Sequence, residues 1–352
     1  MYLQNNNLYQ EDIEYVAGLA LDWSKLKDKS LLITGATGMI GSFLVDVIMH
    51  KNAKDNLGCS LILLGRDERK AKERFAEYFN ESSFSFFVRD VNKDMDIPLE
   101  SIDYLIHAAS NTHPMLYSTD PIGTMMTNII GTRNLLELSK KMRAQRILFL
   151  SSVEIYGENR GDCEKYTEDY CGYIDCNTVR AGYTEGKRAG EALCQAYIKQ
   201  EGLDIVIPRL ARIYGPTMLK SDTKALSQFI NKGVAKEDIV LKSAGTQLFS
   251  YCYVADAVAG LLFCLFEGSC GEAYNIADRK SDVTLKELSE MIAHQANRRV
   301  VYEIPDAVEQ TGYSKATKAL LDSTKLQKLG WLAKYSIEDG IIRTMNMLET
   351  LK

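Results

Sequence analysis

The chain has 352 residues, of which 46% are hydrophobic and 25% are charged. This length and composition predict a globular protein of about two domains and exclude collagen-like and low-complexity chains. With 42 Lys and Arg against 47 Asp and Glu, the net charge is −5, which offers no basic surface for nucleic acid and no polybasic membrane patch. The strongest apolar run, 258–266, is bounded by Asp256 and Glu267, so we expect no segment that crosses a membrane.

Cysteine and histidine usage bears on metal binding and on the cellular compartment. The eight cysteines are scattered without a Cys-x-x-Cys pair, and the four histidines are isolated from one another. This arrangement argues against a zinc site, and we expect no metal. Residues 1–14 are polar and acidic, unlike the layout of a secretory signal. Together these features predict a reduced, cytoplasmic protein.

Elements of secondary structure follow from the hydrophobic periodicity. Residues 1–28 are expected to form a helical lead-in, because Ile13, Val16, Ala17 and Ala20 recur at helical spacing. Expected strands then cover residues 30–34, 61–64, 84–88, 104–107, 146–150 and 204–207. Expected helices cover residues 42–50, 67–78, 125–142 and 184–200. This alternation predicts an α/β fold with a doubly wound parallel sheet.

The last third of the chain has a different pattern. Residues 281–296 and 314–329 are expected to be helical, with loops between them, which predicts a smaller C-terminal lobe. We therefore expect a first domain of residues 29–208 with a return segment near 245–260. The second lobe would comprise residues 209–244 and 261–352.

A glycine-rich loop lies between the first expected strand and the helix that follows. The segment Thr34-Gly-Ala-Thr-Gly-Met-Ile-Gly41 reads G-x-x-G-x-x-G. Gly35 permits a tight turn, Gly38 lets the backbone approach a pyrophosphate, and Gly41 lets helix and strand touch. The loop predicts a dinucleotide site that includes Thr37, Met39 and Ile40. Residues 29–208 would then be the dinucleotide-binding domain, and the second lobe would bind the substrate.

The end of the second expected strand bears on the choice of cofactor. A ribose-binding acid is usual there, but the sequence is Leu64-Gly-Arg-Asp67. A glycine in place of the acid, followed by Arg66, favours a 2′-phosphate and hence NADP. Asp67 would still reach a ribose, so both NAD and NADP remain open. After the third strand, Asp90 and Val91 are placed to contact the adenine.

Tyr183 and Lys187 form a Tyr-x-x-x-Lys motif, which places both on one helix face. An expected strand upstream ends at Ser152, and the carboxyl ends of parallel strands line the ligand crevice. Tyr183 would take the proton of a substrate hydroxyl while a hydride passes to the nicotinamide, with Ser152 bonded to the reacting oxygen. We expect the Lys187 ammonium and the positive nicotinamide to lower the pKa of Tyr183, which is about 10 in water.

These motifs together resemble the extended short-chain dehydrogenase/reductase superfamily, in its NAD-dependent epimerase/dehydratase branch, which modifies nucleotide sugars. The resemblance runs from about Leu31 to Met347. Within that branch the chain is most similar to the UDP-glucuronate decarboxylase (UDP-xylose synthase) family. The segments that carry the resemblance, besides the glycine loop, are His107-Ala-Ala-Ser110, Thr127-Asn-Ile-Ile-Gly-Thr132, Ser151-Ser-Val-Glu-Ile-Tyr-Gly157, Glu168-Asp-Tyr-Cys-Gly-Tyr173, Arg180-Ala-Gly-Tyr-Thr-Glu-Gly-Lys-Arg188, Arg209-Leu-Ala-Arg-Ile-Tyr-Gly-Pro216 and Tyr253-Val-Ala-Asp256.

The resemblance implies roles for further residues. Ser152 stands at the position of the family's catalytic Thr, and Glu154 at that of its catalytic Glu. Cofactor contacts are implied for Ala108, Ala109, Ser110 and Asn128, beside the predicted contacts of Tyr183 and Lys187. Substrate contacts are implied for Ser110, Thr112, Arg212, Gln247 and Phe249. The helices at 125–142 and 184–200 resemble those that pair two subunits, which implies a homodimer.

The implied reaction begins with oxidation of the sugar at carbon 4 by tightly bound NAD(P). Glu154 favours decarboxylation, and Val153 replaces the acid that a dehydratase needs. A 4-epimerase that shares the first, oxidative part of this reaction and releases no CO2 remains an alternative.

Two departures concern the substrate. Arg212 replaces the family's Asn, and Phe249 replaces an Arg that grips the nucleotide diphosphate. Arg212 would supply that charge from another side. Otherwise the chain would be an NADPH-dependent reductase of a non-nucleotide ketone, which Arg66 and Phe249 favour. The Ser152, Tyr183 and Lys187 set argues against a catalytically silent protein.

Overall fold

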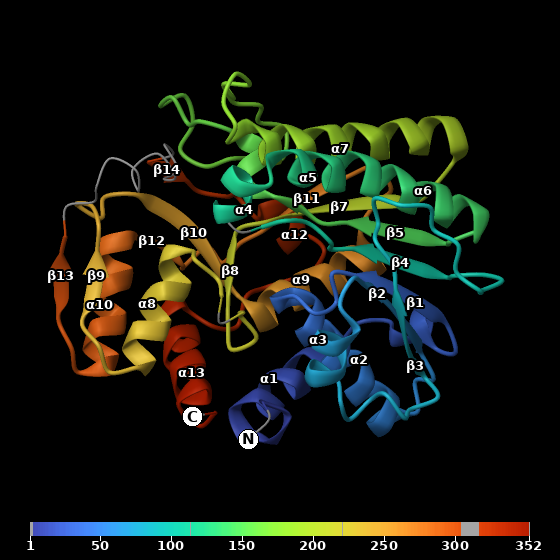
Figure 1. Ribbon diagram of the computed structural model, residues 1–352, viewed down its shortest axis with the longest axis horizontal. Helices are drawn as coiled ribbons and strands as arrows, with labels where there is room; N and C mark the ends of the chain where they lie inside the picture. Colours follow the sequence, from blue (N-terminus) through green and yellow to red (C-terminus); the bar gives the residue numbers. More distant parts are fainter. Residues whose placement is uncertain (1–2, 113, 220, 304–316, 352) are drawn as a thin grey trace.

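The computed structural model describes residues 3–112, 114–219, 221–303 and 317–351, and this part of the chain forms two lobes (Figure 1). The sheet of the first lobe consists of strands β1 (Ser30–Thr34), β2 (Ser60–Gly65), β3 (Phe84–Val88), β4 (Tyr104–His107), β5 (Arg146–Phe149), β6 (Ser151–Ser152), β7 (Ile205–Leu210) and β11 (Ala273–Ile276). All pair in parallel, in the order β11-β7-β5-β4-β1-β2-β3, with β6 also beside β7. This order confirms the predicted doubly wound sheet.

Helices cover both faces of this sheet (Figure 1). One face carries α2 (Met39–Asp55), α3 (Glu68–Arg74) and α9 (Val254–Glu267), with α1 (Asn7–Ala17) packed on α2 and α9. The other face carries α4 (Pro114–Thr119), α5 (Pro121–Met126), α6 (Thr132–Lys141) and α7 (Ala181–Glu201). Short helical turns are η1 (Leu3–Asn5), η2 (Trp23–Leu26), η3 (Thr127–Gly131) and η4 (Val153–Tyr156). Because both faces are covered, the central strands are apolar runs, as at Leu31, Leu32 and Ile33.

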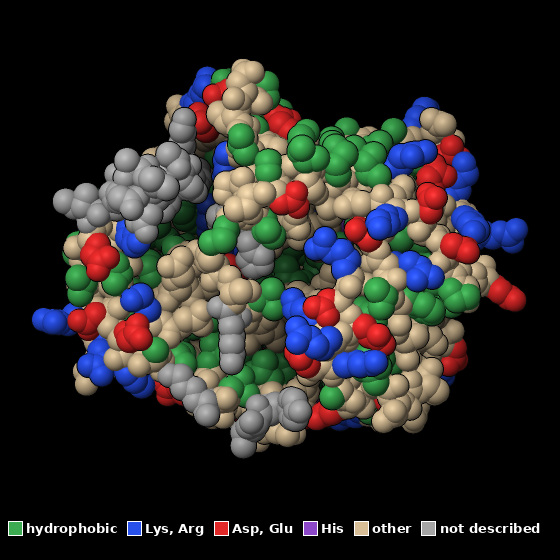
Figure 2. All heavy atoms as spheres, in the orientation of Figure 1, with side chains coloured by type: hydrophobic (Ala, Val, Ile, Leu, Met, Phe, Trp, Pro, Cys, Tyr) green, Lys and Arg blue, Asp and Glu red, His purple; other side chains and the backbone are tan. Residues whose placement is uncertain are grey.

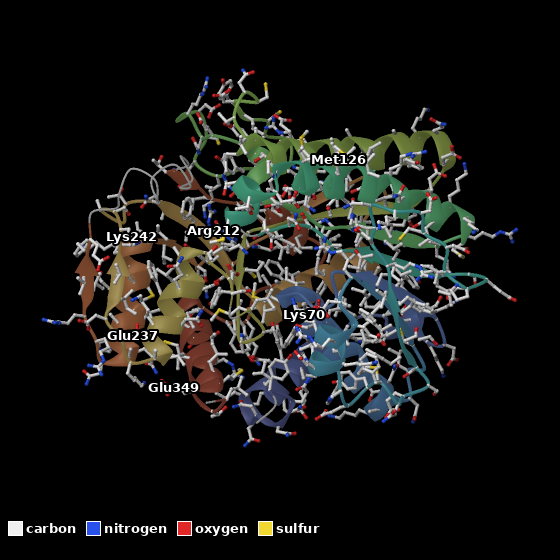
Figure 3. All side chains as sticks on the ribbon, viewed as in Figure 1. Lys70, Met126, Arg212, Glu237, Lys242 and Glu349 are labelled. Carbon is white, nitrogen blue, oxygen red and sulfur yellow. The ribbon has the colours of Figure 1, made fainter. Side chains whose placement is uncertain are left out.

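The second lobe contains two small sheets and a group of helices. One sheet comprises β8 (Arg212–Tyr214), β10 (Leu248–Tyr253), β12 (Asp282–Thr284) and β14 (Lys318–Ala319), and the other β9 (Ile239–Leu241) and β13 (Val300–Tyr302). Helices α8 (Ala225–Val234), α10 (Leu285–Ala296) and α13 (Ile337–Glu349) pack together, while α12 (Thr324–Gln327) lies against β11 and α9. Figure 2 shows the surface hollowed between the lobes, and Figure 3 shows Arg212 at their junction.

The return of the chain to the first lobe differs from the expected range 245–260. Strand β10 pairs with β8, β12 and β14 in the second lobe. Helix α9 instead packs on β5 and β7, and β11 adds to the edge of the large sheet beside β7. The apolar run 258–266 is thus a buried helix, and residues assigned to the second lobe from 261 onward include part of the first.

Two helices expected in the last third of the chain are shorter than predicted. Residues 282–284 form β12, and α10 begins only after Thr284, whose side chain accepts a hydrogen bond from Glu287 N in a capping box. Of the range 314–329, residues 314–316 lie outside the described residues, 318–319 form β14, and only Thr324–Gln327 is helical. Pairing of β14 with β10 outweighs the local helical pattern there.

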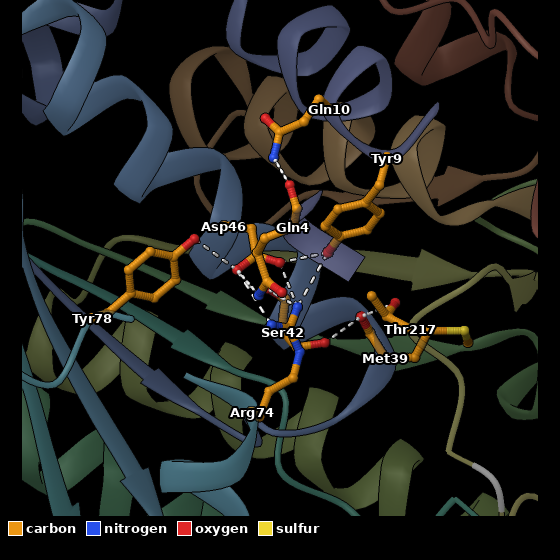
Figure 4. A network of polar contacts seen from close by, with 9 residues as sticks. All are labelled: Gln4, Tyr9, Gln10, Met39, Ser42, Asp46, Arg74, Tyr78 and Thr217. Carbon is orange, nitrogen blue, oxygen red and sulfur yellow. Dashed lines mark hydrogen bonds and ion pairs between the residues drawn. The ribbon is translucent and has the colours of Figure 1, made fainter. Parts of the chain in front are cut away.

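The helical lead-in is fastened by a buried carboxylate on α2 (Figure 4). Tyr9 of α1 donates a hydrogen bond to Asp46 (2.5 Å), and Tyr78 donates another (3.1 Å). Arg74 of α3 forms an ion pair with the same carboxylate, whose side chain is 0% exposed. One acidic side chain thus joins α1, α2 and the segment around α3.

Replacing Asp46 with Ala should destabilise the fold by about 3–5 kcal/mol, because it leaves the Arg74 guanidinium buried without its anion. Chemical denaturation monitored by circular dichroism measures the loss. Asp55→Ala, at the end of the same helix, is the matched control, because Asp55 pairs with Lys51 but is 49% exposed. It should cost less than about 1 kcal/mol. Equal losses in the two variants would contradict the assignment of Asp46 as the central anion.

The described residues contain neither a membrane-spanning helix nor a cluster of metal ligands. None of their helices combines the length and apolarity needed to span a bilayer. No group of three or more His, Cys, Asp or Glu among them is placed to hold a metal ion. The eight cysteines are free thiols in the structure.

Candidate active site

The polar segments after the central strands meet at one edge of the large sheet. The glycine loop follows β1, the segment Ala108–Ser110 follows β4, and Ser152 follows β5. Strands β4 and β5 are neighbours, and β4 also pairs with β1. Since the carboxyl ends of parallel strands lie at the same edge, these segments border one crevice, where the winding of the sheet changes direction.

The glycine loop forms a close-fitting backbone cradle. Gly35 has φ +70°, and a Cβ there would lie 2.7 Å from the Ala108 carbonyl. A Cβ on Gly41 would lie 2.6 Å from Gly35 O. Helix α2 begins after Gly38, and no side chain caps it, so the N–H groups of its first turn are available to an anion. The backbone of this loop fits the pyrophosphate of a dinucleotide. A side chain at position 35 or 41 would collide with neighbouring backbone atoms and disrupt the loop.

The other predicted cofactor residues lie around this cradle. Ala109 N donates to Thr34 Oγ1 (3.1 Å), which fixes the segment after β4. Asp90 accepts a hydrogen bond from Asn92 N (3.0 Å), and Val91 is buried against η3. Arg66 is exposed at the end of β2.

The Asp67 side chain forms a hydrogen bond within the protein. Its side chain accepts a hydrogen bond from Lys70 N (3.0 Å) and caps α3. This carboxylate is therefore already engaged, whereas the Arg66 side chain is exposed.

Asn128 lies in η3, a π-helical turn that interrupts the helix expected over 125–142. Asn128 is fully buried, accepts a hydrogen bond from Ser110 Oγ (2.8 Å) and donates to Thr124 O (3.1 Å). Helix α7 packs closely on it, because a Cβ on Gly186 would lie 3.1 Å from Asn128 Cβ. The turn therefore links the loop after β4 to the helix that carries the Tyr-Lys motif, and π-turns are frequent at functional sites.

Tyr183 and Lys187 lie in the first turns of α7, and both are buried. The Lys187 ammonium donates to Leu150 O (2.7 Å), at the end of β5, and lies 4.9 Å from the Phe149 ring centroid. Burial lowers the pKa of Lys187 to about 8. The structure thus anchors α7 to the same strand end that carries Ser152.

The pKa of Tyr183 differs from the expectation. Burial raises the pKa of Tyr183 to about 12, while the Ser152 side chain and the charge of Arg180 lower it and the charge of Glu154 raises it. The expected lowering by Lys187 is therefore not seen in the protein alone, because burial outweighs the charges that act on the phenol. A positive charge brought in by a bound cofactor would act in the lowering direction.

Ser152 and Glu154 lie beside this tyrosine. Helix α7, which carries Tyr183, packs against β6 and η4, which carry Ser152 and Glu154. The Oγ of Ser152 accepts a hydrogen bond from Glu154 N (3.3 Å) in the first turn of η4. Glu154 accepts a hydrogen bond from Arg180 Nη2 (3.2 Å) and lies 3.8 Å from Arg212 Nη2. The structure therefore brings together Ser152, Glu154 and Tyr183.

The two residues that depart from the family pattern contact each other. Arg212 of β8 lies with its Cζ 3.5 Å from the centroid of the Phe249 ring of β10. Arg212 thus occupies space beside the position of the absent arginine, and the aromatic ring supports its guanidinium.

The remaining predicted substrate residues are Gln247 and Thr112. Gln247 lies just before β10, where its side chain accepts a hydrogen bond from Ser243 (3.4 Å). Thr112 is half-buried in the loop after β4. No described contact joins either side chain to Tyr183 or Glu154.

Sequence reasoning missed two residues of this site, Tyr117 and Arg180. Tyr117 of α4 stacks on Tyr183, with ring centroids 4.8 Å apart. The Arg180 guanidinium lies over the Tyr117 ring, 4.6 Å from its centroid. Arg180 lies three residues before Tyr183, within the segment 180–188 that resembles the family, so the resemblance could have indicated it. Tyr117 has no comparable signal, because its contact depends on how α4 folds over α7.

Two UDP-glucuronic acid decarboxylases are similar in sequence to this chain over most of its length. It is 32% identical to UDP-glucuronic acid decarboxylase 6 of Arabidopsis thaliana, over 88% of this chain and 86% of that protein. It is 30% identical to UDP-glucuronic acid decarboxylase 1 of Danio rerio, over 90% and 72%.

Solved structures share the fold. A dTDP-glucose 4,6-dehydratase from Streptomyces venezuelae with NAD bound has a TM-score of 0.77 at 22% identity, covering 91% of this chain and 97% of that one. A UDP-glucuronic acid 4-epimerase from Bacillus cereus, in complex with UDP-glucuronic acid and NAD, has a TM-score of 0.78 at 22% identity, covering 92% and 100%. Residues 31–277 match the NAD dependent epimerase/dehydratase family. The chain therefore belongs to the NAD dependent epimerase/dehydratase family.

Proposed function

We propose that this protein modifies a nucleotide sugar by transient oxidation at carbon 4, and that it acts as a UDP-glucuronate decarboxylase. The observation that carries the proposal is the packing of Tyr183's helix α7 against the segments that carry Ser152 and Glu154, with Lys187 bonded to Leu150 O at the sheet edge that holds the glycine cradle. Similarity to UDP-glucuronic acid decarboxylases over most of the chain supports this choice within the family.

Tyr183, Ser152 and Lys187 would each have a separate role in this reaction. Tyr183 takes the proton from the sugar's 4-hydroxyl, and Ser152 holds that oxygen by a hydrogen bond. Lys187, fixed on Leu150 O, keeps α7 and its tyrosine at the strand end. When bound, NAD(P) supplies the hydride acceptor at carbon 4 and later returns the hydride, so it is regenerated in each turnover.

Decarboxylation then follows from the new ketone. A carboxylate on carbon 5 makes the oxidised sugar a β-keto acid. The bond between carbon 5 and the carboxylate carbon therefore breaks with loss of CO2, and its electron pair moves through carbon 5 to the ketone oxygen to form an enolate. Carbon 5 next takes up a proton. Glu154 would order the ring or the water that delivers this proton.

Mass spectrometry of the products tests this function. Incubation with UDP-glucuronate should give a product lighter by one CO2. A product of unchanged mass, from UDP-glucuronate or UDP-glucose, would instead identify a 4-epimerase. Stoichiometric consumption of added NADPH with a non-nucleotide ketone would identify the reductase that Arg66 and Phe249 favour on sequence grounds.

Release of the bound dinucleotide after denaturation tests the cofactor. We expect NAD or NADP to remain on the protein through purification, because a cofactor regenerated in each turnover has no need to leave. The exposed Arg66, together with the engagement of Asp67 as a helix cap, favours NADP. Recovery of NAD alone would show that Arg66 does not read a 2′-phosphate.

We also propose that the protein is a cytoplasmic homodimer. The free cysteines support a reducing compartment. Hydrophobic side chains gather over α4, α5 and the start of α7 (Figure 2), and Figure 3 labels Met126 on this surface. The apolar residues include Met115 (59% exposed), Ile122 (76%) and Val179 (61%). An exposed apolar patch of this kind marks an interaction surface.

Replacing Ile122 with Glu should convert the dimer to monomers, because it puts a charge in the proposed interface. Sedimentation velocity at several protein concentrations measures the change. Leu332→Glu is the control, since Leu332 is 69% exposed but lies in the segment between α12 and α13. An Ile122→Glu variant that sediments like the unchanged protein would place any dimer interface elsewhere.

A further inference from the structure

Two arginines beside Glu154 are not used by the reaction steps given above. Glu154 accepts a hydrogen bond from Arg180 (3.2 Å) and lies 3.8 Å from Arg212. One carboxylate therefore lies between two guanidinium groups, and the cluster keeps one positive charge in excess. A single further carboxylate would neutralise it.

Each arginine also has a nitrogen without a partner. Arg180 Nη1 and Arg212 Nη1 are buried and make no hydrogen bond within the described part of the chain. Buried donors are nearly always paired, and those of a guanidinium suit the two oxygens of a carboxylate. The two guanidinium groups thus have donor capacity that the described part of the chain does not use.

The cluster lies at the reacting end of the site. Arg180 covers Tyr117, and Tyr117 stacks directly on Tyr183. Arg212 lies on Phe249 from the second lobe's sheet. The phosphate cradle, in contrast, is formed by the turn before α2. An anion bound by both arginines would therefore belong to the sugar near carbon 4.

We propose that Arg180 and Arg212 bind the carboxylate of the sugar and select a nucleotide sugar whose hexose is a uronic acid. This inference rests on the function proposed above and names the group that the site recognises. Phe249 supports Arg212 in this role, and Glu154 holds both guanidinium groups in place before the substrate binds. The arginines are thus specificity-determining residues that leave the proton transfer to Tyr183.

Calorimetric titration tests the inference through binding instead of turnover. The titrations use UDP-glucuronate, UDP-glucose and UDP, each with protein that also carries Tyr183→Phe so that no ligand is consumed. Arg180→Gln and Arg212→Gln should each weaken UDP-glucuronate binding about tenfold or more, the loss expected for a charged hydrogen bond. Binding of UDP-glucose and UDP should change little. Arg160→Gln, a control on an arginine that is 59% exposed, should leave all three affinities unchanged.

The outcomes separate this inference from the proposed function. Equal weakening for all three ligands would show that the arginines bind the diphosphate, and unchanged affinity for UDP-glucuronate would show that they bind neither group; both overturn the inference alone. Failure of the parent protein to bind any of the three would overturn the proposed function as well. If Arg180→Gln does not fold, Arg180→Lys replaces it and should still weaken UDP-glucuronate selectively, because lysine cannot bind a carboxylate bidentately.

Discussion

Replacing Tyr183 with Phe should reduce turnover about 10²–10⁴-fold, the usual contribution of a positioned general base. The change removes only the phenol oxygen, and the ring keeps its stacking on Tyr117. Affinity for the dinucleotide and thermal stability should therefore be close to those of the unchanged protein. Initial rates of CO2 release from UDP-glucuronate measure the effect.

A second tyrosine of the same helix provides the control. Tyr197 of α7 hydrogen bonds to Glu137 away from the crevice, and Tyr197→Phe should keep full activity. If Tyr183→Phe kept a comparable rate, the base would have to be another group and the proposed division of roles would fail.

Replacing Gly41 with Ala should displace α2 from the turn after β1 and release the dinucleotide. The new Cβ would lie 2.6 Å from Gly35 O and 2.7 Å from Ala36 Cα, and both are backbone atoms that cannot rotate away. Overpacking of this kind costs about 1–3 kcal/mol. We expect lower thermal stability together with loss of the retained cofactor, measured by the absorbance of the dinucleotide released from denatured protein.

Gly182→Ala is the matched control for this substitution. A Cβ on Gly182 would meet the Met125 side chain at 3.6 Å and Pro121 O at 3.9 Å, which are ordinary van der Waals contacts. Alanine in a helix interior is favourable, so stability should stay equal or rise. Retention of the dinucleotide by Gly41→Ala at the level of this control would contradict the assignment of the glycine loop as the cradle.

The central sheet was predictable from sequence because its strands are buried on both faces. The expected ranges 30–34, 84–88 and 104–107 coincide with β1, β3 and β4. The short strand β14 was missed, since a strand of two residues exists only through its pairing with β10. The π-turn η3 was missed for a similar reason, because it depends on the packing of α7 against Asn128.

The candidate site divides in the same way. Ser152, Tyr183 and Lys187 were predicted to share one crevice because strand ends and helical spacing determine their positions, whereas Glu154 was indicated only by the resemblance to the family. The stack of Arg180 on Tyr117 and the contact between Arg212 and Phe249 join segments far apart in the chain, so no local pattern predicts them. The pKa of Tyr183 likewise depends on burial, which the motif alone does not reveal.

A crystal structure with the dinucleotide and an unreactive analogue of UDP-glucuronate tests the central claim most directly. We expect the Tyr183 phenol oxygen within about 3 Å of the substituent on the sugar's carbon 4, with that carbon facing the nicotinamide ring. A phenol that points away from both, with the sugar held elsewhere, would contradict the account.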